Sequence, residues 1–571
     1  MTGISRMLTF PHFTPHFPRA QWTLAAVLEH QAQRRGDAPF LQWTDTGKAY
    51  SFDAVNRRVN RLAHGFIEQG IGKGDRVVLF LPNCLEYVFA WFALMKIGAV
   101  EVPISNNGKG AFLEHQMRLA EPRLLITTAD LVGRLTGIEQ ALDSVRACYL
   151  VGEPADAPAF ARIEQRAFDS LHHDDDRNPA VALDYREPAA VLYTSGTTGP
   201  SKAVVMSHSQ FYFFAEETVQ MTALGPDDCY MTGFPLFHGN AQFMTVYPSL
   251  IVGARCVLYD RFSATDFFGR ARRSGATVAN LLGATSAFLC AQPPGEDDRA
   301  HNLRRIYAAP ISPELVPVFA ERFGIDTFVN GFGQTEISLP FITPAGHAIP
   351  PHSVGVPVDQ WFEVRLADPE TDEEVGEGET GELLVRPRQP FVICSEYLGM
   401  PEKTIETWRN LWFHTGDAMR RDANGWYYFV DRVKDALRRR GENISSFEVE
   451  STVRTFPAVA ECAVVAVPAD EQGGEDEIKA CVTARGGTAI DPAELIAWCD
   501  ARMPSFMVPR YIEILDALPQ TPSEKVRKKE LRDRGVTAAT WDRIKAGTYL
   551  AGERNRPTSA VSGMSKEGSF R

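Results

Sequence analysis

The sequence predicts an α/β fold, with a large N-terminal domain of parallel-sheet subdomains, a β-rich subdomain and a small C-terminal α+β domain. Three observations predict it. From about Trp22 onward, short apolar runs alternate with segments of helical periodicity, as in parallel sheets covered by helices. Between about residues 355 and 430 the pattern changes to short strands separated by turns. The length, 571 residues, corresponds to three or four structural units of roughly 150 residues.

The first elements follow from local periodicity. Residues 52–70 carry apolar side chains at helical spacing, and an apolar strand follows the turn Gly-Lys-Gly-Asp within residues 72–83. Residues 86–97 predict a buried helix that ends before Gly98, and residues 99–104 predict the next strand. Further strands are expected at residues 124–128, 190–193, 255–259 and 327–330.

The chain is expected to divide into successive regions. Residues 1–21 form an N-terminal extension and residues 22–430 the large domain. A smaller domain follows at residues 435–550, with strands in Ala-Glu-Cys-Ala-Val-Val-Ala-Val-Pro and in Ile-Lys-Ala-Cys-Val-Thr-Ala. The polar, aperiodic residues 551–571 predict a disordered tail.

Composition excludes several classes of protein. With 59 basic and 72 acidic residues the net charge is −13, which disfavours nucleic acid as a partner. The nine cysteines show no metal-ligand spacing and predict reduced thiols in a cytoplasmic protein. The N-terminus lacks the apolar core of a signal peptide, and the most hydrophobic stretch, residues 77–104, is too interrupted to span a membrane.

A loop rich in glycine and hydroxyl side chains is the most specific feature. It reads Tyr-Thr-Ser-Gly-Thr-Thr-Gly-Pro-Ser-Lys over residues 193–202 and follows an apolar strand. Its glycines let backbone N–H groups approach an anion, its hydroxyls add donors and Lys202 adds a positive charge. The loop therefore predicts a polyphosphate site rather than a flexible linker, and its spacing differs from a Walker A loop. The phosphate-binding residues expected are Thr194, Ser195, Gly196, Thr197, Thr198, Gly199 and Lys202.

At this point the chain resembles the adenylate-forming enzymes: acyl-CoA synthetases, peptide-synthetase adenylation domains and firefly luciferase. A second segment, Asn-Gly-Phe-Gly-Gln-Thr-Glu, resembles the nucleotide motif of that family. The resemblance places Phe332 against adenine, Thr335 at the α-phosphate and Glu336 on Mg²⁺, with Thr198 as a second possible metal ligand. Its other nucleotide-binding residues are Ala308, Ala309, Pro310, Asn330, Gly331, Gly333 and Gln334.

Downstream motifs match the family in the same order. The resemblance implies that Asp417 and Arg432 hold the ribose and that residues 431–434, with Lys434 as pivot, form the hinge of a mobile C-terminal domain. The segment that follows resembles the carnitine/crotonobetaine–CoA ligase branch. Its coenzyme A residues would be Arg438, Arg440, Gly441 and Glu442. Read alone, the arginines also fit a solvated helix face.

The segment Pro-Gln-Thr-Pro-Ser-Glu-Lys resembles the loop that carries the family's catalytic lysine, here Lys525. Most members have glycine before that lysine, whereas this chain has Glu524. A solvated lysine is the alternative reading.

The acyl pocket is expected around Pro-Leu-Phe-His-Gly-Asn, residues 235–240. By resemblance His238 gates the carboxylate, and an α-amino acid substrate is disfavoured because peptide-synthetase domains have aspartate there. A histidine packed in the core is the alternative. The pocket residues expected are His238, Gly239, Asn240, Gly283 and Ala284, whose small size leaves room for a sizeable acyl group.

The resemblance implies an AMP-forming acyl-CoA synthetase that uses ATP, Mg²⁺ and coenzyme A on a small carboxylic acid, as a monomer or homodimer. Lys525, Thr335, Glu336 and His238 would be its catalytic residues. Two alternatives stay open. The acyl group is transferred to an acceptor other than coenzyme A, or the chain is a non-catalytic nucleotide-binding regulator.

Overall fold

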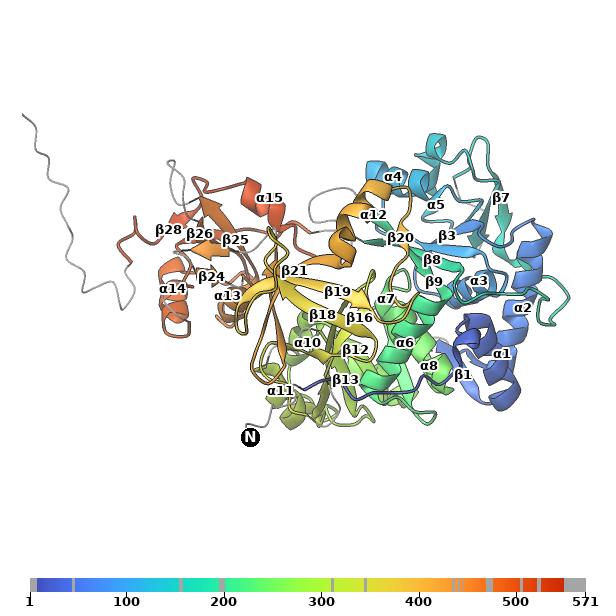
Figure 1. The fold of residues 1–571 in the computed structure, drawn as a ribbon, viewed down its shortest axis with the longest axis horizontal. Coiled ribbons are helices and arrows are strands. Elements are labelled where there is room, and N and C mark those ends of the chain that lie inside the picture. The colour runs from blue at the N-terminus through green and yellow to red at the C-terminus, as the bar shows by residue number, and fades with distance from the viewer. Residues whose placement is uncertain are drawn as a thin grey trace, which may run out of the picture. The chain divides into compact units, whose positions relative to one another are not determined.

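The structure, a computed structural model, divides the chain into two compact units at Phe429/Val430. It describes residues 8–43, 47–152, 158–194, 201–309, 313–343, 347–433, 437–439, 442–444, 446–468, 476–503, 507–520 and 525–548. The first unit contains three sheets and the second unit contains the remaining strands, which can be followed in Figure 1.

The first sheet is parallel except at one edge. Its strand order is β14-β13-β12-β10-β11-β1-β2, and only β2 runs antiparallel to its neighbour. The strands are β1 (Pro39–Trp43), β2 (Ala49–Ser51), β10 (Cys229–Thr232), β11 (Arg255–Leu258), β12 (Val278–Leu281), β13 (Arg305–Ala308) and β14 (Thr327–Val329).

The second sheet has the order β20-β9-β8-β4-β3-β5-β6-β7. Its strands from β8 to β7 are parallel, whereas β9 and β20 add an antiparallel edge. The strands are β3 (Arg76–Phe80), β4 (Val100–Pro103), β5 (Leu124–Thr128), β6 (Ala147–Val151), β7 (Glu164–Ala167), β8 (Pro188–Thr194), β9 (Lys202–Ser207) and β20 (Glu396–Tyr397).

The third sheet is the predicted β-rich subdomain, with the order β15-β16-β17-β22-β21-β19-β18. Its pairs from β15 to β22 and from β21 to β18 are antiparallel. It starts at Gly331, earlier than the expected residue 355, because Gly-Phe-Gly-Gln and the apolar strand after it lack the alternation of polar and apolar residues. The strands are β15 (Gly331–Gln334), β16 (Ser338–Ile342), β17 (Ser353–Pro357), β18 (Phe362–Ala367), β19 (Thr380–Pro387), β21 (Phe413–Arg421) and β22 (Tyr427–Arg432).

Helices fill the connections between the strands. Those of the first unit are α1 (Leu24–Arg35), α2 (Phe52–Glu68), α3 (Leu85–Lys96), α4 (Gly110–Ala120), α5 (Val132–Thr136), α6 (His208–Thr222), α7 (Gly239–Ala241), α8 (Tyr247–Val252), α9 (Phe267–Ser274), α10 (Gly283–Cys290), α11 (Leu315–Val318) and α12 (Pro401–Thr407). Single turns of 3₁₀ or π type are η1 (Arg19–Gln21), η2 (Glu139–Ala141), η3 (Phe168–Leu171), η4 (Gln242–Val246), η5 (Phe319–Phe323) and η6 (Arg409–Leu411).

Helix α6 is buried along nearly its whole length. Ser207 caps its start by accepting a hydrogen bond from the Gln210 N–H at 3.1 Å. Its polar side chains reach other parts of the first unit, because a buried polar group must find a partner. Glu217 accepts the Leu339 N–H at 3.0 Å, and Glu216 binds the N-terminal segment.

The N-terminal segment, residues 8–17, lies against three parts of the first unit. The Phe10 N–H donates to the Pro357 carbonyl at 2.9 Å, and the Phe13 N–H donates to the Gln360 side chain at 2.8 Å. His16 Nδ1 lies 2.9 Å from Glu216 Oε1, and the His16 N–H donates to Glu216 Oε2 at 3.1 Å. This segment therefore connects the third sheet to helix α6.

The second unit contains a hairpin and a four-stranded sheet of order β25-β26-β27-β28. Strands β25 and β26 contain the two predicted apolar segments and pair antiparallel. The elements are β23 (Leu437–Arg439), β24 (Glu442–Ile444), α13 (Ser446–Arg454), β25 (Val459–Pro468), β26 (Asp476–Ala484), α14 (Pro492–Asp500), β27 (Tyr511–Ile514), α15 (Lys528–Asp533) and β28 (Trp541–Asp542). The predicted tail, residues 551–571, lies outside the described residues.

Candidate active site

Several predicted site residues lie where the parallel strands of the first sheet end. Strand β12 ends at Leu281, shortly before Gly283, and β13 ends at Ala308, next to Ala309. Strand β14 ends at Val329, next to Asn330. Open α/β sheets bind ligands outside the carboxyl ends of their strands. The fold therefore brings these residues to the edge where a ligand site is expected, although Pro310 and the side chain of Ala284 lie outside the described residues.

Glu336 forms the centre of a cluster of three polar side chains. It is 5% exposed, and its Oε1 accepts a hydrogen bond from the Tyr397 hydroxyl at 3.1 Å. Lys202 Nζ lies 3.6 Å from the same oxygen and donates to the Tyr397 hydroxyl at 2.8 Å. The Thr194 hydroxyl lies 3.4 Å from Glu336 Oε1. Thr194 ends β8 and Lys202 begins β9, so the two residues that flank the predicted phosphate loop both lie beside Glu336, the predicted metal ligand.

Tyr397 was not predicted from the sequence. It lies on β20, a strand of two residues that pairs with β9 so that Tyr397 is opposite Val204. Burial, together with the negative charge of Glu336, raises the pKa of Tyr397, so its hydroxyl stays protonated and donates to the carboxylate. A single tyrosine in a segment of mixed polar and apolar residues is too common a signal to identify this role.

The turn that carries Thr335 and Glu336 joins β15 to β16. The buried Gln210 of α6 fixes it, since its Nε2 donates to the Thr335 carbonyl at 2.8 Å and to the Glu336 carbonyl at 3.3 Å. Gly333 permits the tight approach of the two strands, because a Cβ there would lie 2.0 Å from the Ser338 carbonyl oxygen. The half-buried Thr335 is thereby held beside Glu336.

The expected adenine and ribose residues also belong to the third sheet. The half-buried Phe332 ring lies parallel to Phe429, with ring centres 6.2 Å apart and an angle of 27° between the planes. Gln334 Nε2 donates to the Thr415 carbonyl at 3.1 Å and to the carboxylate of Asp417, which is 1% exposed. The sheet thus brings Gln334 and Asp417 into direct contact.

His238 is exposed rather than packed in the core. Its Nδ1 accepts the N–H of Asn240 at 3.4 Å at the start of α7. Gly239 is buried, and a Cβ there would lie 2.0 Å from the Phe243 ring. The polar side chains of His238 and Asn240 therefore flank a backbone position that is tightly packed against Phe243.

The remaining predicted residues belong to the second unit or lie outside the described residues. The half-buried Arg432 donates its backbone N–H to Asp431 at 2.7 Å, and the exposed Lys525 precedes the bridge between Gln520 and Val526. In the β23–β24 hairpin Arg438 pairs with Asn443 and Glu442 pairs with Arg439, and these side chains are not described. Besides Pro310, the predicted residues outside the described ranges are Ser195, Gly196, Thr197, Thr198, Gly199, Lys434, Arg440 and Gly441.

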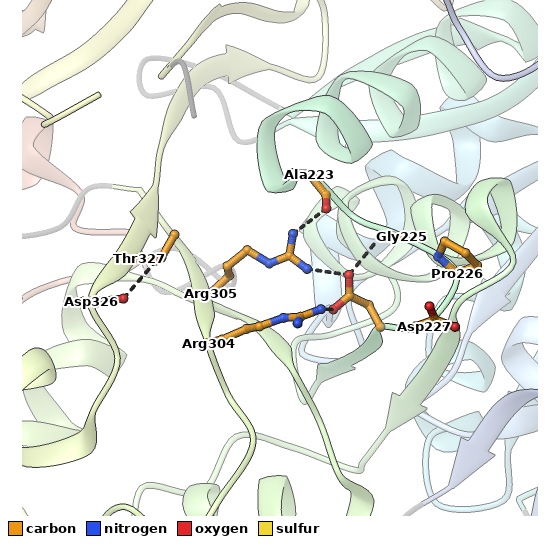
Figure 2. Close-up of a pocket in the computed structure, with 9 residues that line it drawn as sticks. Ala223, Gly225, Pro226, Asp227, Arg304, Arg305, Asp326 and Thr327 are labelled. Atoms are coloured by element: carbon orange, nitrogen blue, oxygen red, sulfur yellow. Dashed lines mark hydrogen bonds and ion pairs between the residues drawn. The ribbon is translucent and has the colours of Figure 1, made fainter. Parts of the chain in front are cut away.

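A cavity of about 480 Å³ lies at the opposite edge of the first sheet, where β13 and β14 begin (Figure 2). None of the predicted site residues lines it. Asp228 accepts a hydrogen bond from Arg304 at 2.6 Å and pairs with Arg305, which also binds the carbonyls of Thr222 and Ala223. Burial raises the pKa of Asp228, but hydrogen bonds from Thr277 and the arginines bring it down to about 2. The cluster ties the end of α6 to the starts of β10 and β13.

Comparisons with known proteins decide the family. The sequence profile described as "AMP-binding enzyme" matches residues 28–393, and the profile "AMP-binding enzyme C-terminal domain" matches residues 448–525. The chain belongs to the AMP-binding enzyme family. The crotonobetaine/carnitine–CoA ligase of Salmonella paratyphi A is 32% identical over 494 residues, which cover 85% of this chain and 93% of that protein.

Solved structures show the same fold. An anthranilate CoA ligase in complex with anthranoyl-AMP superposes with a TM-score of 0.81 at 24% identity, covering 91% of this chain and 98% of that chain. A benzoate CoA ligase from Burkholderia xenovorans gives a TM-score of 0.77 at 24% identity, covering 89% and 99%. The AMP-binding family, the α/β fold with a smaller C-terminal domain and the assignment as an enzyme are thereby confirmed.

Two further expectations concern membranes and thiols. Among the helices of the described residues, none is both long and apolar enough to cross a bilayer. All nine cysteines are described and none forms a disulfide; seven of them are buried.

Proposed function

We propose that this AMP-binding enzyme activates a carboxylic acid with ATP and transfers the acyl group to coenzyme A, releasing pyrophosphate and AMP. The observation that carries the proposal is the contact between Lys202, Tyr397 and Glu336 beside the ends of the phosphate-loop hairpin. The names of the curated relatives, acid–CoA ligases that cover most of the chain, support the same reaction.

In the first half-reaction a substrate carboxylate oxygen attacks the α-phosphorus of ATP, and the bond from that phosphorus to pyrophosphate breaks. Both reactants are anionic, so positive groups must reduce their repulsion. Lys202 supplies one such charge, and a unit charge about 4 Å from a phosphate contributes about 4 kcal/mol at an effective dielectric near 20. Thr335, whose carbonyl accepts a hydrogen bond from Gln210, would donate its hydroxyl to the α-phosphate.

The oxygen donors at the cluster fit a magnesium ion carried by ATP. Mg²⁺ is usually held by one or two carboxylates together with substrate phosphates and water. Glu336 offers one carboxylate and Thr194 offers a hydroxyl, and the described residues contain no group of three acidic, histidine or cysteine side chains that would hold a metal alone. The ion would neutralise phosphate charge, while Tyr397 and Lys202 orient the Glu336 carboxylate.

In the second half-reaction the sulfur of coenzyme A attacks the acyl carbon, and the bond from that carbon to AMP breaks. We infer that Lys525 serves the first step and that Arg438, Arg440 and Gly441 serve the second. Both sets belong to residues 435–550. A rotation of this domain about Lys434 would exchange them, with Asp417 and Arg432 holding the ribose throughout.

The proposal is tested with a panel of short, medium, long and aromatic acids, assayed with ATP and Mg²⁺ with and without coenzyme A. Acid-dependent pyrophosphate release together with coenzyme A-dependent AMP release is expected. Pyrophosphate without coenzyme A-dependent AMP would indicate another acceptor. No acid-dependent pyrophosphate from any acid would indicate a non-catalytic nucleotide-binding protein.

The role of Lys525 is tested by separating the half-reactions. Lys525→Ala should abolish pyrophosphate release, because the variant lacks the charge at the reacting phosphates, and should spare thioester formation from preformed acyl-AMP. Lys529→Ala is the matched control, since Lys529 is an exposed lysine of α15 that pairs with Asp533. Unchanged pyrophosphate release by Lys525→Ala would remove the residue from this role.

A further inference from the structure

A buried network of amide and hydroxyl groups lies beneath the segment assigned to the acyl pocket. Asn280, on β12, is 3% exposed. Its Nδ2 lies 2.9 Å from Asn240 Oδ1, 3.0 Å from the Thr245 hydroxyl and 3.3 Å from the Met244 carbonyl oxygen. Its Oδ1 accepts a hydrogen bond from the Tyr230 hydroxyl.

The chemistry of the partners fixes the orientation of both amides. The Met244 carbonyl can only accept, so the atom of Asn280 that faces it is the nitrogen. Burial raises the pKa of Tyr230, which keeps its hydroxyl a donor to Asn280 Oδ1. Since the Asn280 nitrogen donates, the atom of Asn240 that faces it must be the carbonyl oxygen.

This orientation leaves the amide N–H groups of Asn240 directed away from the network. Asn240 is half-buried, and its side-chain nitrogen forms no hydrogen bond with any of the described residues, whereas its Oδ1 faces Asn280. Its neighbour His238 is exposed. The segment therefore presents a fixed pair of donors on its accessible side, next to the histidine expected at the substrate carboxylate.

The other side of the segment is closed by aromatic rings. The Phe243 ring lies where a Gly239 side chain would be, with its centre 4.3 Å from Phe214 and 5.2 Å from Phe211. All three rings are at most 4% exposed. A long alkyl chain therefore cannot extend past Gly239 without displacing packed side chains, which is costly in a close-packed interior.

We propose that the acid activated by this enzyme has a compact acyl group carrying a hydrogen-bond-accepting oxygen, which binds the Asn240 amide, and that Asn280 is the positioning residue that orients that amide. The inference rests on the proposed function. A site with an unpaired donor favours a substrate that pairs with it over an analogue that leaves it unpaired.

The experiment compares acids that differ by one oxygen, 3-hydroxybutanoate with butanoate and 3-hydroxybenzoate with benzoate, together with decanoate. Pyrophosphate release gives kcat and KM for each acid. We expect the oxygen-bearing acid to have the higher kcat/KM in at least one pair, by about tenfold or more, and decanoate to be the poorest substrate. If neither oxygen-bearing acid is preferred to its partner, or if decanoate is the best substrate, the inference is overturned while the proposed function stays intact. No reaction with any acid would overturn both.

Variants distinguish a hydrogen bond from the Asn240 amide to the substrate from a general effect on the structure. Asn240→Leu should reduce the kcat/KM ratio within the preferred pair to about one, because it removes the donor that separates the two acids of that pair. Asn280→Asp places a second acceptor opposite Asn240 Oδ1, so it should raise KM for the preferred acid more than it lowers kcat. Asn302→Leu, at an exposed position before β13, is the matched control and should keep the ratio. An unchanged ratio in Asn240→Leu would overturn the inference.

Discussion

At the scale of single residues, hydrogen bonds to buried partners define the candidate site more than exposed charges do. Glu336 depends on the hydroxyl of Tyr397, and the peptide groups around Glu336 depend on the amide of Gln210. When a buried acceptor loses its hydrogen-bond donor, the free energy spent on removing the acceptor from water is no longer compensated. The partners of the predicted residues therefore matter as much as the predicted residues themselves.

Tyr397→Phe tests this dependence. The variant keeps the ring beside Lys202 but removes the hydroxyl that joins Lys202 to Glu336, so we expect the rate of acid-dependent pyrophosphate release to fall roughly tenfold or more, corresponding to about 1–3 kcal/mol. Tyr149→Phe is the control, because its hydroxyl lies on the second sheet and accepts a hydrogen bond from Arg166 at 3.2 Å. Equal rates in the two variants would show that the hydroxyl has no role.

Residue types suggested part of the candidate site, but not its supporting contacts. The glycine- and hydroxyl-rich loop pointed to Lys202, whereas Glu336 and Asp417 came from the resemblance to the adenylate-forming enzymes, and the roles of all three stay predictions. Tyr397 and Gln210 could not be predicted, since their roles arise from pairings between segments that lie 61 and about 126 residues away from Glu336 in the chain. Long-range pairing leaves no local pattern.

At the scale of elements, two hairpins hold the site together. Strands β8 and β9 bring Thr194 opposite Lys202, and strands β15 and β16 carry the turn with Glu336. The expected strands and helices were found close to their predicted bounds where periodicity was strong, as for α2 and α3. The start of the third sheet was predicted too late, because short strands rich in glycine carry little periodic signal.

Gly333→Ala tests the tight approach within the second hairpin. A Cβ at 2.0 Å from the Ser338 carbonyl oxygen forces the strands apart, so we expect a loss of stability of about 1–3 kcal/mol or more and weaker ATP binding. Chemical denaturation and a nucleotide titration measure the two effects. Gly72→Ala is matched, since nothing lies within 4 Å of a Cβ there, and it should stay close to the parent.

At the scale of the whole molecule, the structure describes two units whose cores are separate. One set of buried residues includes Trp91 and Phe213 of the first unit, and another includes Val464 and Leu495 of the second. Because each unit buries its own apolar residues, each can stay folded when the two units move relative to each other. Such movement suits the two-step reaction proposed above. The N-terminal segment, which the sequence indicated only as an extension, belongs to the first of these cores through Phe10 and Phe17.

His16 should make the stability of the first unit depend on pH. Its hydrogen bond with the buried Glu216, reinforced by that charge, raises the pKa of His16. The folded pKa lies above the unfolded one, so the added stability is complete below about pH 6.5 and is lost as the pH rises through the folded value. Tyr212 and Gln220, which donate to the same carboxylate, remain as partners at high pH.

Thermal unfolding at about pH 5.5 and pH 8 measures this contribution. His16→Gln should reduce the stability of the parent more at the lower pH than at the higher one. His12→Gln removes a histidine whose partner, Asp359, is 38% exposed, and should change stability little at either pH. A pH-independent loss in His16→Gln would contradict the assignment.

Helix α6 has a consequence for recombination between relatives. It lies in the chain between β9 of the second sheet and β10 of the first, yet its side chains bind three distant segments. Gln210 holds the turn before β16, Glu217 holds the start of β16 and Glu216 holds the N-terminal segment. A chimera whose crossover falls between residues 223 and 330 takes α6 from one parent and the peptide groups that Gln210 and Glu217 bind from the other. For segment exchange, residues 8–17, α6 and the β-rich subdomain should therefore come from the same parent, so that the contacts that support the site are preserved.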